Sequence, residues 1–253
     1  MRVGWFGVAG AALVLTLSPV SGGGAAERAA APAAVSVVQA VPGQQVTVTV
    51  DGTSVEGGAA GVGDVLGPLE LTPGEHALAF SDGSGSVDVT STLEVKAGST
   101  SDVVLHLPAD VGGAPVVNSY VTPTGPIGPG KARVLVAHTA TVAPADVRVD
   151  GKVVFTNIAN GEFATADVPA GTHVVELLPT GQKSNPILGP IDLRVTAGTV
   201  SKVYAVGNPR DRSMQVILHS ATLRPDGSVV PDTIRTGSAG LAADIPLHPF
   251  GPH

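Results

Sequence analysis

The chain has 253 residues, a formal net charge of −7 at pH 7 and no cysteine. The acidic balance argues against nucleic acid as a partner, because nucleic-acid-binding domains present basic patches. The lack of cysteine excludes disulfides and cysteine nucleophiles, and a chain of this length buries enough core to fold without such cross-links.

The N-terminus is typical of a secretory signal peptide. After Arg2, an apolar run covers residues 3–17 and gives way to Ser18-Pro19 and small residues. The run is shorter than the roughly 20 apolar residues of a membrane helix, and its order of basic, apolar and small-residue regions is that of an export signal. We expect residues 1–26 to be removed, with cleavage as late as residue 31 or an uncleaved anchor as alternatives. We expect the product to be secreted or extracellular, with association with the cell envelope as an alternative. After removal of the signal it should not be inserted in a membrane.

The first predicted domain covers residues 33–124, and its clearest element is a β-hairpin. In "VTVDGTSV" (48–55), valines alternate with polar residues up to Asp51-Gly52. Alternation places apolar and polar side chains on opposite faces of a strand. Asp-Gly suits a type I′ turn, which needs positive φ at both central residues. Further turns are expected at Pro73-Gly74, Asp82-Gly83 and Ala97-Gly98.

The second predicted domain, residues 132–225, repeats the first at an offset of about 100 positions. "VRVDGKVV" repeats the hairpin, and "LEVKAGSTSDVV" returns as "LRVTAGTVSKVY". A Pro/Gly linker (125–131) separates the domains, and a Pro-rich, irregular tail (226–253) follows. Short strands at regular spacing predict an all-β fold of two tandem antiparallel β-sandwiches, immunoglobulin-like or transthyretin-like. In the second domain we expect strands near 132–139, 146–150, 152–156, 163–168, 172–178, 190–196, 199–206 and 214–222.

The histidines form no recognisable catalytic or metal-ligating set. His76 and His173 occupy equivalent positions of the two repeats, each just after a glycine turn, which favours a structural role. His138 ends an expected strand without a second ligand at metal-binding spacing, and His248 and His253 fall in the tail. We therefore predict no catalytic residues, no cofactor-binding residues and no metal ligands.

A cluster of oxygen-bearing side chains in "DGSGSVD" (82–88) is similar to the start of a calcium loop. The EF-hand pattern fails downstream, because Val87 stands where glycine is needed and Leu93 where a bidentate glutamate is needed. We interpret this segment as a hairpin loop that enters a strand.

Aromatic residues are scarce after the signal segment. Phe80, Phe155, Tyr120 and Tyr204 fall in expected strands, where they suit a core better than an exposed platform. Glycan-binding and protein-binding surfaces favour exposed rings. A lectin-like role is therefore disfavoured.

Four motifs follow one another in the second half: "ARVLVAH", "VRVDGKVV", "VPAG" and "AGT". In this order they resemble the bacterial family called domain of unknown function 4397. Residues 131–209 fit closely, and the first half fits more loosely, with Gln39 in place of the residue matching His138. The resemblance implies two tandem copies, the second being the closer match, together with a sandwich fold and export. It implies no activity, because the family has none assigned.

These observations favour a non-enzymatic exported β-sandwich module of the bacterial cell envelope or exterior. Its expected role is structural or interactive, as a monomer that binds an unknown envelope or extracellular protein. One alternative is a secreted hydrolase or enzyme accessory domain, and another is ligand or glycan binding in the cleft between the domains. A cavity lined by histidines and carboxylates would favour the enzyme, whereas an exposed apolar patch or a bare sheet edge would favour the binding module.

Overall fold

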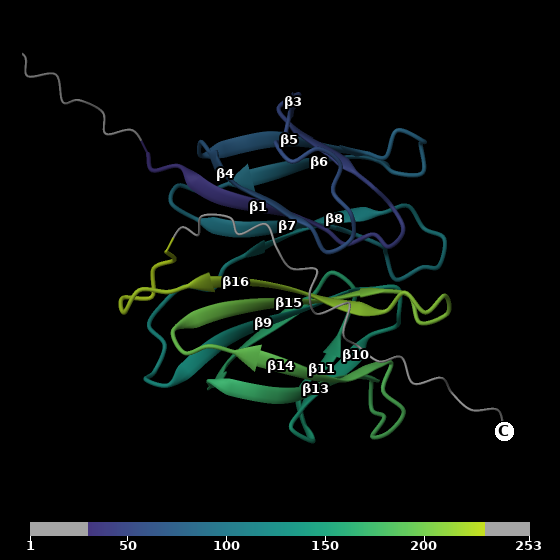
Figure 1. Cartoon of the computed structure of the whole chain (residues 1–253), viewed down its shortest axis with the longest axis vertical. Coiled ribbons are helices and arrows are strands. Elements are labelled where there is room, and N and C mark those ends of the chain that lie inside the picture. The colour runs from purple at the N-terminus through teal and green to yellow at the C-terminus, as the bar shows by residue number, and fades with distance from the viewer. Residues whose placement is uncertain (1–29, 231–253) are drawn as a thin grey trace, which may run out of the picture.

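The computed structural model of the protein describes residues 30–230, and within them every regular element is a β-strand (Figure 1). The expected signal peptide and the expected tail beyond residue 230 lie outside the described residues. The strands of the first half are β1 (Ala33–Gln39), β2 (Thr47–Val50), β3 (Thr53–Ser54), β4 (Val65–Leu71), β5 (Gly74–Ser81), β6 (Asp88–Val95), β7 (Thr100–His106) and β8 (Val116–Val121). Those of the second half are β9 (Lys131–Ala140), β10 (Ala145–Val149), β11 (Lys152–Ile158), β12 (Phe163–Pro169), β13 (Gly171–Pro179), β14 (Leu188–Val195), β15 (Thr199–Gly207) and β16 (Gln215–Thr222).

Each half is a sandwich of two four-stranded sheets, and the two halves repeat one strand order. The sheets are β3-β2-β5-β6 and β4-β1-β7-β8 in the first half, and β11-β10-β13-β14 and β12-β9-β15-β16 in the second. The predicted all-β fold of two tandem sandwiches is confirmed. Most neighbours are antiparallel, but β1 pairs with β7, and β9 with β15, in parallel. Alternation did not reveal these two pairs, because it indicates which face of a strand is buried and not the direction of its neighbour.

The repeated Asp-Gly turns have the backbone geometry that the sequence predicts. Asp51 and Asp150 have φ of 50° and 49°, and Gly52 and Gly151 both have φ of 77°. Positive φ at both central residues is the type I′ geometry, whose twist suits a hairpin. The two hairpins differ in length, because β3 has 2 residues whereas β11 has 7. The second sandwich therefore has a long outer strand that the first lacks.

Each sandwich has its own hydrophobic core, filled by alternate residues of its strands. Val103 and Leu105 of β7 lie in the first core, and Val203 and Ala205 of β15 lie in the second. The positions between them are also buried. β7 and β15 are thus covered on both faces, and each contains a short apolar run, residues 103–105 and 203–206.

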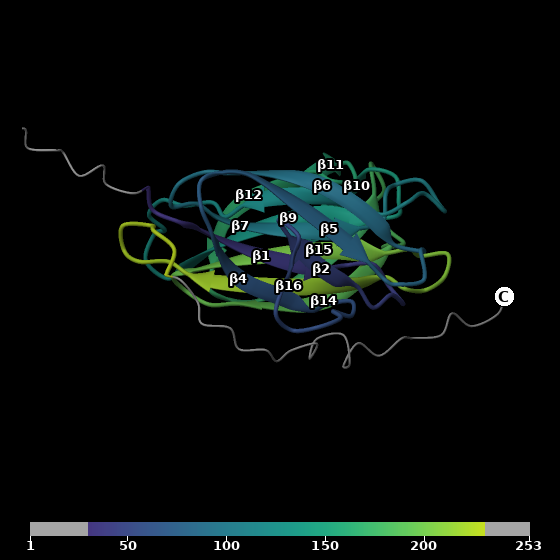
Figure 2. The same cartoon turned by 90° about the horizontal axis from the view of Figure 1, so that it is seen from above.

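The two sandwiches stack on each other, so that the molecule has four β-layers (Figures 1 and 2). The sheet of β4-β1-β7-β8 faces the sheet of β12-β9-β15-β16, and a third hydrophobic cluster lies between them. The contact between the sandwiches is therefore part of the buried interior.

The segment that joins the sandwiches is held by contacts to the second one. Arg133 of β9 donates a hydrogen bond of 2.7 Å to the carbonyl oxygen of Thr124 and forms an ion pair of 2.6 Å with Asp167 of β12. Near the other end, Leu223 and Val229 form an antiparallel bridge. The first residues of the expected irregular tail thus continue the fold.

Candidate functional site at the interface between the sandwiches

The region between the sandwiches is filled by packed side chains. Their source is the two facing sheets, above all the central strands β1, β7, β9 and β15. The alternative function of ligand or glycan binding would require a cleft between the two domains. In the structure a hydrophobic cluster occupies this region. Its buried members are Val38, Ala40, Val104, Tyr120, Leu135, Ala137, Tyr204, Val206 and Ile217.

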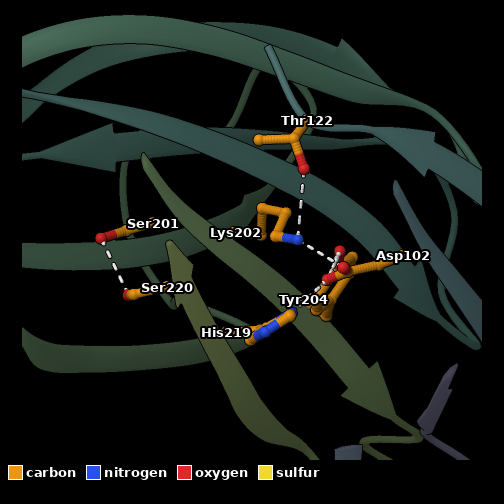
Figure 3. Close-up of polar contacts among 7 residues, drawn as sticks. All are labelled: Asp102, Thr122, Ser201, Lys202, Tyr204, His219 and Ser220. Carbon is orange, nitrogen blue, oxygen red and sulfur yellow. Dashed lines mark hydrogen bonds and ion pairs between the residues drawn. The ribbon is translucent and has the colours of Figure 1, made fainter. Parts of the chain in front are cut away.

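A buried ionic network lies within this interface (Figure 3). Asp102 comes from β7 of the first sandwich, and its partners Lys202, Tyr204 and His219 come from β15 and β16 of the second. Lys202 Nζ donates to Asp102 Oδ1, and it lies 3.4 Å from Oγ1 of Thr122. The Tyr204 hydroxyl donates to Asp102 Oδ2 at 2.8 Å, and His219 Nδ1 lies 2.7 Å from the same oxygen. One carboxylate therefore binds three side chains of the other sandwich.

Strand alternation explains why these polar residues face one another. Asp102 is two positions from Val104, and Lys202 two positions from Tyr204; both of these neighbours belong to the interface cluster. Residues two apart on a strand share a face, so Asp102 and Lys202 point into the interface. Val103 lies between Asp102 and Val104, and Val203 lies between Lys202 and Tyr204. Each of these two valines points into the core of its own sandwich.

The network sets the charge state of its members. Burial alone would raise the pKa of Asp102, but the charge of Lys202 and the hydrogen bond from His219 hold it below its usual value. Burial and the neighbouring Asp102 charge raise the pKa of Tyr204 well above its usual range, so its hydroxyl stays protonated and donates. Lys202 and Asp102 thus form an ion pair, and Tyr204 and His219 both donate to Oδ2 of the same carboxylate.

Asp102 and Lys202 are both fully buried, whereas the His219 side chain is 23 % exposed. An external substrate cannot contact the carboxylate or the amine while the sandwiches are stacked. The geometry is therefore that of a joint between two domains and differs from an open catalytic cleft.

A second group of contacts joins the β11–β12 turn to the first sandwich. The Tyr120 hydroxyl donates to the carbonyl oxygen of Gly161 at 3.1 Å, and Asn160 Nδ2 donates to the carbonyl oxygen of Leu107 at 3.1 Å. Asn160-Gly161 forms the turn between β11 and β12. An Asn-Gly pair in a sequence indicates a turn, but it does not indicate that the turn also contacts the other domain.

His138 lies inside the protein near this contact region, with 1 % of its surface exposed. Its Nε2 is 3.3 Å from the carbonyl oxygen of Ala143, and its Nδ1 has no hydrogen-bond partner among residues 30–230. Burial lowers the pKa of His138 and also that of the buried His106. Neither ring has the exposure that a general base acting on an external substrate needs.

The histidines at equivalent repeat positions each pair with the aspartate of an Asp-Gly turn. His76 Nδ1 lies 2.7 Å from Asp51 Oδ2, and its Nε2 lies 2.7 Å from the carbonyl oxygen of Thr72. His173 makes the corresponding pair with Asp150, also at 2.7 Å. The Thr72 carbonyl and Asp51 raise the pKa of His76, and Asp150 leads the contacts that raise the pKa of His173. These contacts fasten the β2–β3 turn to β5 and the β10–β11 turn to β13.

The calcium-like segment forms a hydrogen-bonded loop between β5 and β6. Asp82 accepts hydrogen bonds from the backbone N–H groups of Ser84 at 2.9 Å and Gly85 at 2.8 Å, and from the Ser84 hydroxyl at 2.7 Å. The Ser84 hydrogen bond is the main cause that lowers the pKa of Asp82 to about 2. Val87 is buried in the first core. The aspartate is thus engaged in local turn contacts, in keeping with the hairpin-loop interpretation.

An open groove lies between β11 and β12, the adjoining outer strands of the second sandwich. Its volume is about 690 Å³, and Val154, Phe155 and Phe163 are among its lining residues. Val154 and Phe163 are 48 % and 49 % exposed. The Phe163 ring packs edge-on against Tyr120, with ring centroids 5.7 Å apart and an angle of 86° between the planes. The first sandwich therefore supports an aromatic ring that the second exposes.

The core assignment of the strand aromatics is confirmed for Phe80, Tyr120 and Tyr204, which are 1 %, 1 % and 0 % exposed. Within residues 30–230 no group of three or more histidine, aspartate or glutamate side chains is placed to hold a metal ion. In the same part of the chain, no helix is long and apolar enough to cross a membrane.

Comparison with known families agrees with the resemblance seen in the motifs. Residues 33–145 match the family described as "Domain of unknown function (DUF4397)". This part of the chain is a DUF4397 domain. The DUF4397 match covers the first sandwich, the joining segment and β9, whereas the motifs had indicated a closer fit in the second half. No curated protein matches the chain.

Sequence reasoning on this DUF4397 protein missed the interface network. The signal was present in the repeat: "LEVKAGSTSDVV" and "LRVTAGTVSKVY" place Asp102 and Lys202 at the same position of the two copies. Each charge stands within a run of residues that the structure buries. Opposite charges at one repeat position, each inside an apolar strand, predict a contact between the copies.

Proposed function

We propose that this protein is an exported, non-catalytic module, built from two copies of the DUF4397 domain, that binds another protein through its β11–β12 edge. We define the β11–β12 edge as the two adjoining outer strands of the second sandwich and the groove between them. The open groove between two free strands, with the exposed side chains of Val154 and Phe163 on its lining, is the single observation that carries the proposal.

The backbone of this edge has free hydrogen-bonding groups. In the sheets of residues 30–230, β11 pairs with β10 alone and β12 with β9 alone. A row of unpaired N–H and C=O groups is a template for another strand. In the first sandwich the corresponding outer strand, β3, has only 2 residues. The duplicated fold therefore offers a long edge beside the groove in its second copy.

The side chains of the edge favour a protein partner. Val153 and Val154 of β11 are 46 % and 48 % exposed, and Phe163 at the start of β12 is 49 % exposed. Because Tyr120 packs against the Phe163 ring, the ring loses little freedom on binding. We propose that the occupant is an extended segment of another protein with apolar side chains, which adds to the edge by main-chain hydrogen bonds.

Site-specific photo-crosslinking in the producing bacterium tests the proposal. A photoreactive amino acid replaces Val154 in the groove or, as a control, Val111, which is 56 % exposed and lies in the first sandwich. We expect one dominant cross-linked protein from position 154, none from position 111, and loss of the product when Phe163→Lys is added. Equal cross-linking at both positions, a product made of two copies of this chain, or no product at 154 would overturn the proposal.

A further inference from the structure

The amine of Lys202 is directed at a single carboxyl group. Lys202 and Asp102 belong to different sandwiches, and the side chains of both have an exposed fraction of 0 %. An ammonium group has three N–H bonds to donate. Among residues 30–230 its acceptors are Asp102 Oδ1 and the more distant Thr122 Oγ1, at 3.4 Å.

The apolar surroundings make this ion pair costly to bury. Val104, Leu135 and Val206 belong to the hydrophobic cluster that fills the same interface. Burying two full charges among apolar side chains is costly, and the cost is recovered only when geometry and hydrogen bonding are favourable. An amide between the two side chains would carry no charge, and its formation would release one water molecule.

We propose that Lys202 and Asp102 condense into an isopeptide bond that joins the two sandwiches covalently. In this step the bond between Lys202 Nζ and Asp102 Cγ forms, and the bond between Cγ and Oδ1 breaks. Two protons of the ammonium group pass to Oδ1, which leaves as water, and the third stays on the amide nitrogen. Ammonium and carboxylate together contain all the atoms of amide and water, so the step needs no oxidant, reductant or cofactor.

Two neighbours of the pair assist this condensation. Tyr204 and His219 contact Oδ2, the carboxyl oxygen that becomes the amide oxygen, at 2.8 Å and 2.7 Å. Attack of the amine on Cγ places negative charge on that oxygen, and donors fixed in advance at such a position stabilise the charge. The two contacts also orient the carboxyl group, so that Oδ1 faces the amine and is the oxygen that leaves.

Peptide mapping of the purified full-length protein tests the bond directly. Trypsin cuts after free lysine, so an unlinked chain yields the separate peptides 97–131, 195–202 and 203–210. In a linked chain Lys202 is blocked, and we expect peptide 97–131 joined to an uncut 195–210, lighter than the sum of the two by one water molecule. Recovery of the wild-type chain as unlinked peptides cut after Lys202 would overturn the proposal, whatever the variants do.

Two variants assign the chemistry. Lys202→Arg keeps a buried cation without the reactive amine, and we expect its peptide 97–131 to be recovered unlinked. Tyr204→Phe keeps the ring and removes one donor to Oδ2, so the linked fraction soon after synthesis should fall several-fold and then rise with time. A linked product in Lys202→Arg, or an unchanged linking rate in Tyr204→Phe, would contradict the assigned roles.

Discussion

Replacing Lys202 by methionine removes the amine from the interface network, and methionine keeps an unbranched side chain of similar length. The variant leaves Asp102 fully buried with Tyr204 and His219 as its remaining partners. Removing one member of a buried ion pair costs about 3–5 kcal/mol, because the other charge stays buried and unpaired. For a protein of this size that loss lowers Tm by roughly 6–20 °C. If the isopeptide bond is present, its loss adds about 4.7 kcal/mol by the chain-entropy argument for a closed loop of about 100 residues.

Differential scanning calorimetry of the full chain measures this effect, with Lys152→Met as the matched control, since Lys152 is exposed on β11. The free energy of unfolding of this control should lie within about 0.5 kcal/mol of the wild-type value, as is usual for surface substitutions. The double variant Asp102→Leu, Lys202→Met removes both charges and should be no less stable than Lys202→Met alone. Equal Tm values for Lys202→Met and the wild type, or a double variant that is less stable than Lys202→Met, would contradict this prediction.

The remaining predictions concern the turns, the histidines and catalysis. Gly151 has φ of 77° with no atom within 4 Å of an added Cβ, so Gly151→Val should cost about 1–2 kcal/mol through backbone strain alone; Lys152→Ala should change the denaturation midpoint little. The raised pKa values of His76 and His173 stabilise the fold fully below the unfolded value of 6.5, and this stabilisation is lost as pH rises through the folded values. The urea midpoint should therefore fall on going to mildly alkaline pH, and the pair His76→Gln, His173→Gln should flatten the profile. Screens of esterase, peptidase and glycosidase substrates should stay at background, and turnover that disappears in His138→Ala or His173→Ala would favour the enzyme alternative.

The fold of this protein could be predicted from local sequence because its signals are local. Alternating valines and two Asp-Gly turns determine the hairpins, and the structure places positive φ at Asp51 and Asp150. The repeat then indicated two similar sandwiches. The expected strands near 163–168 and 199–206 agree with β12 and β15 to within one residue at each end.

The arrangement of the two sandwiches could not be predicted in the same way. Sequence alternation shows that Val104 and Tyr204 face away from their own cores, but not what covers that face. The apolar character of β7 and β15 on both faces was the available indication. The Pro/Gly composition of residues 125–131 suggested separate domains, and composition contains no information on the surfaces that such a segment brings together.

The candidate sites depended on contacts between distant parts of the chain. Asp102 and Lys202 are 100 positions apart, and the support of Phe163 by Tyr120 joins different sandwiches. Histidines in a sequence are natural candidates for a catalytic or metal site because of their chemistry. In the structure His76 and His173 fasten turns, while a lysine and an aspartate that belong to no known motif occupy the interface.

Native-state hydrogen exchange of the full chain tests most directly the central claim that two stacked sandwiches form one body with a free β11–β12 edge. We expect amides of β7 and β15 to exchange most slowly and with the same opening free energy, because both strands unfold only when the whole molecule does. We also expect fast exchange for the outward amides of β11 and β12. Different opening free energies for β7 and β15, or strong protection along the β11–β12 edge of the isolated protein, would contradict the account.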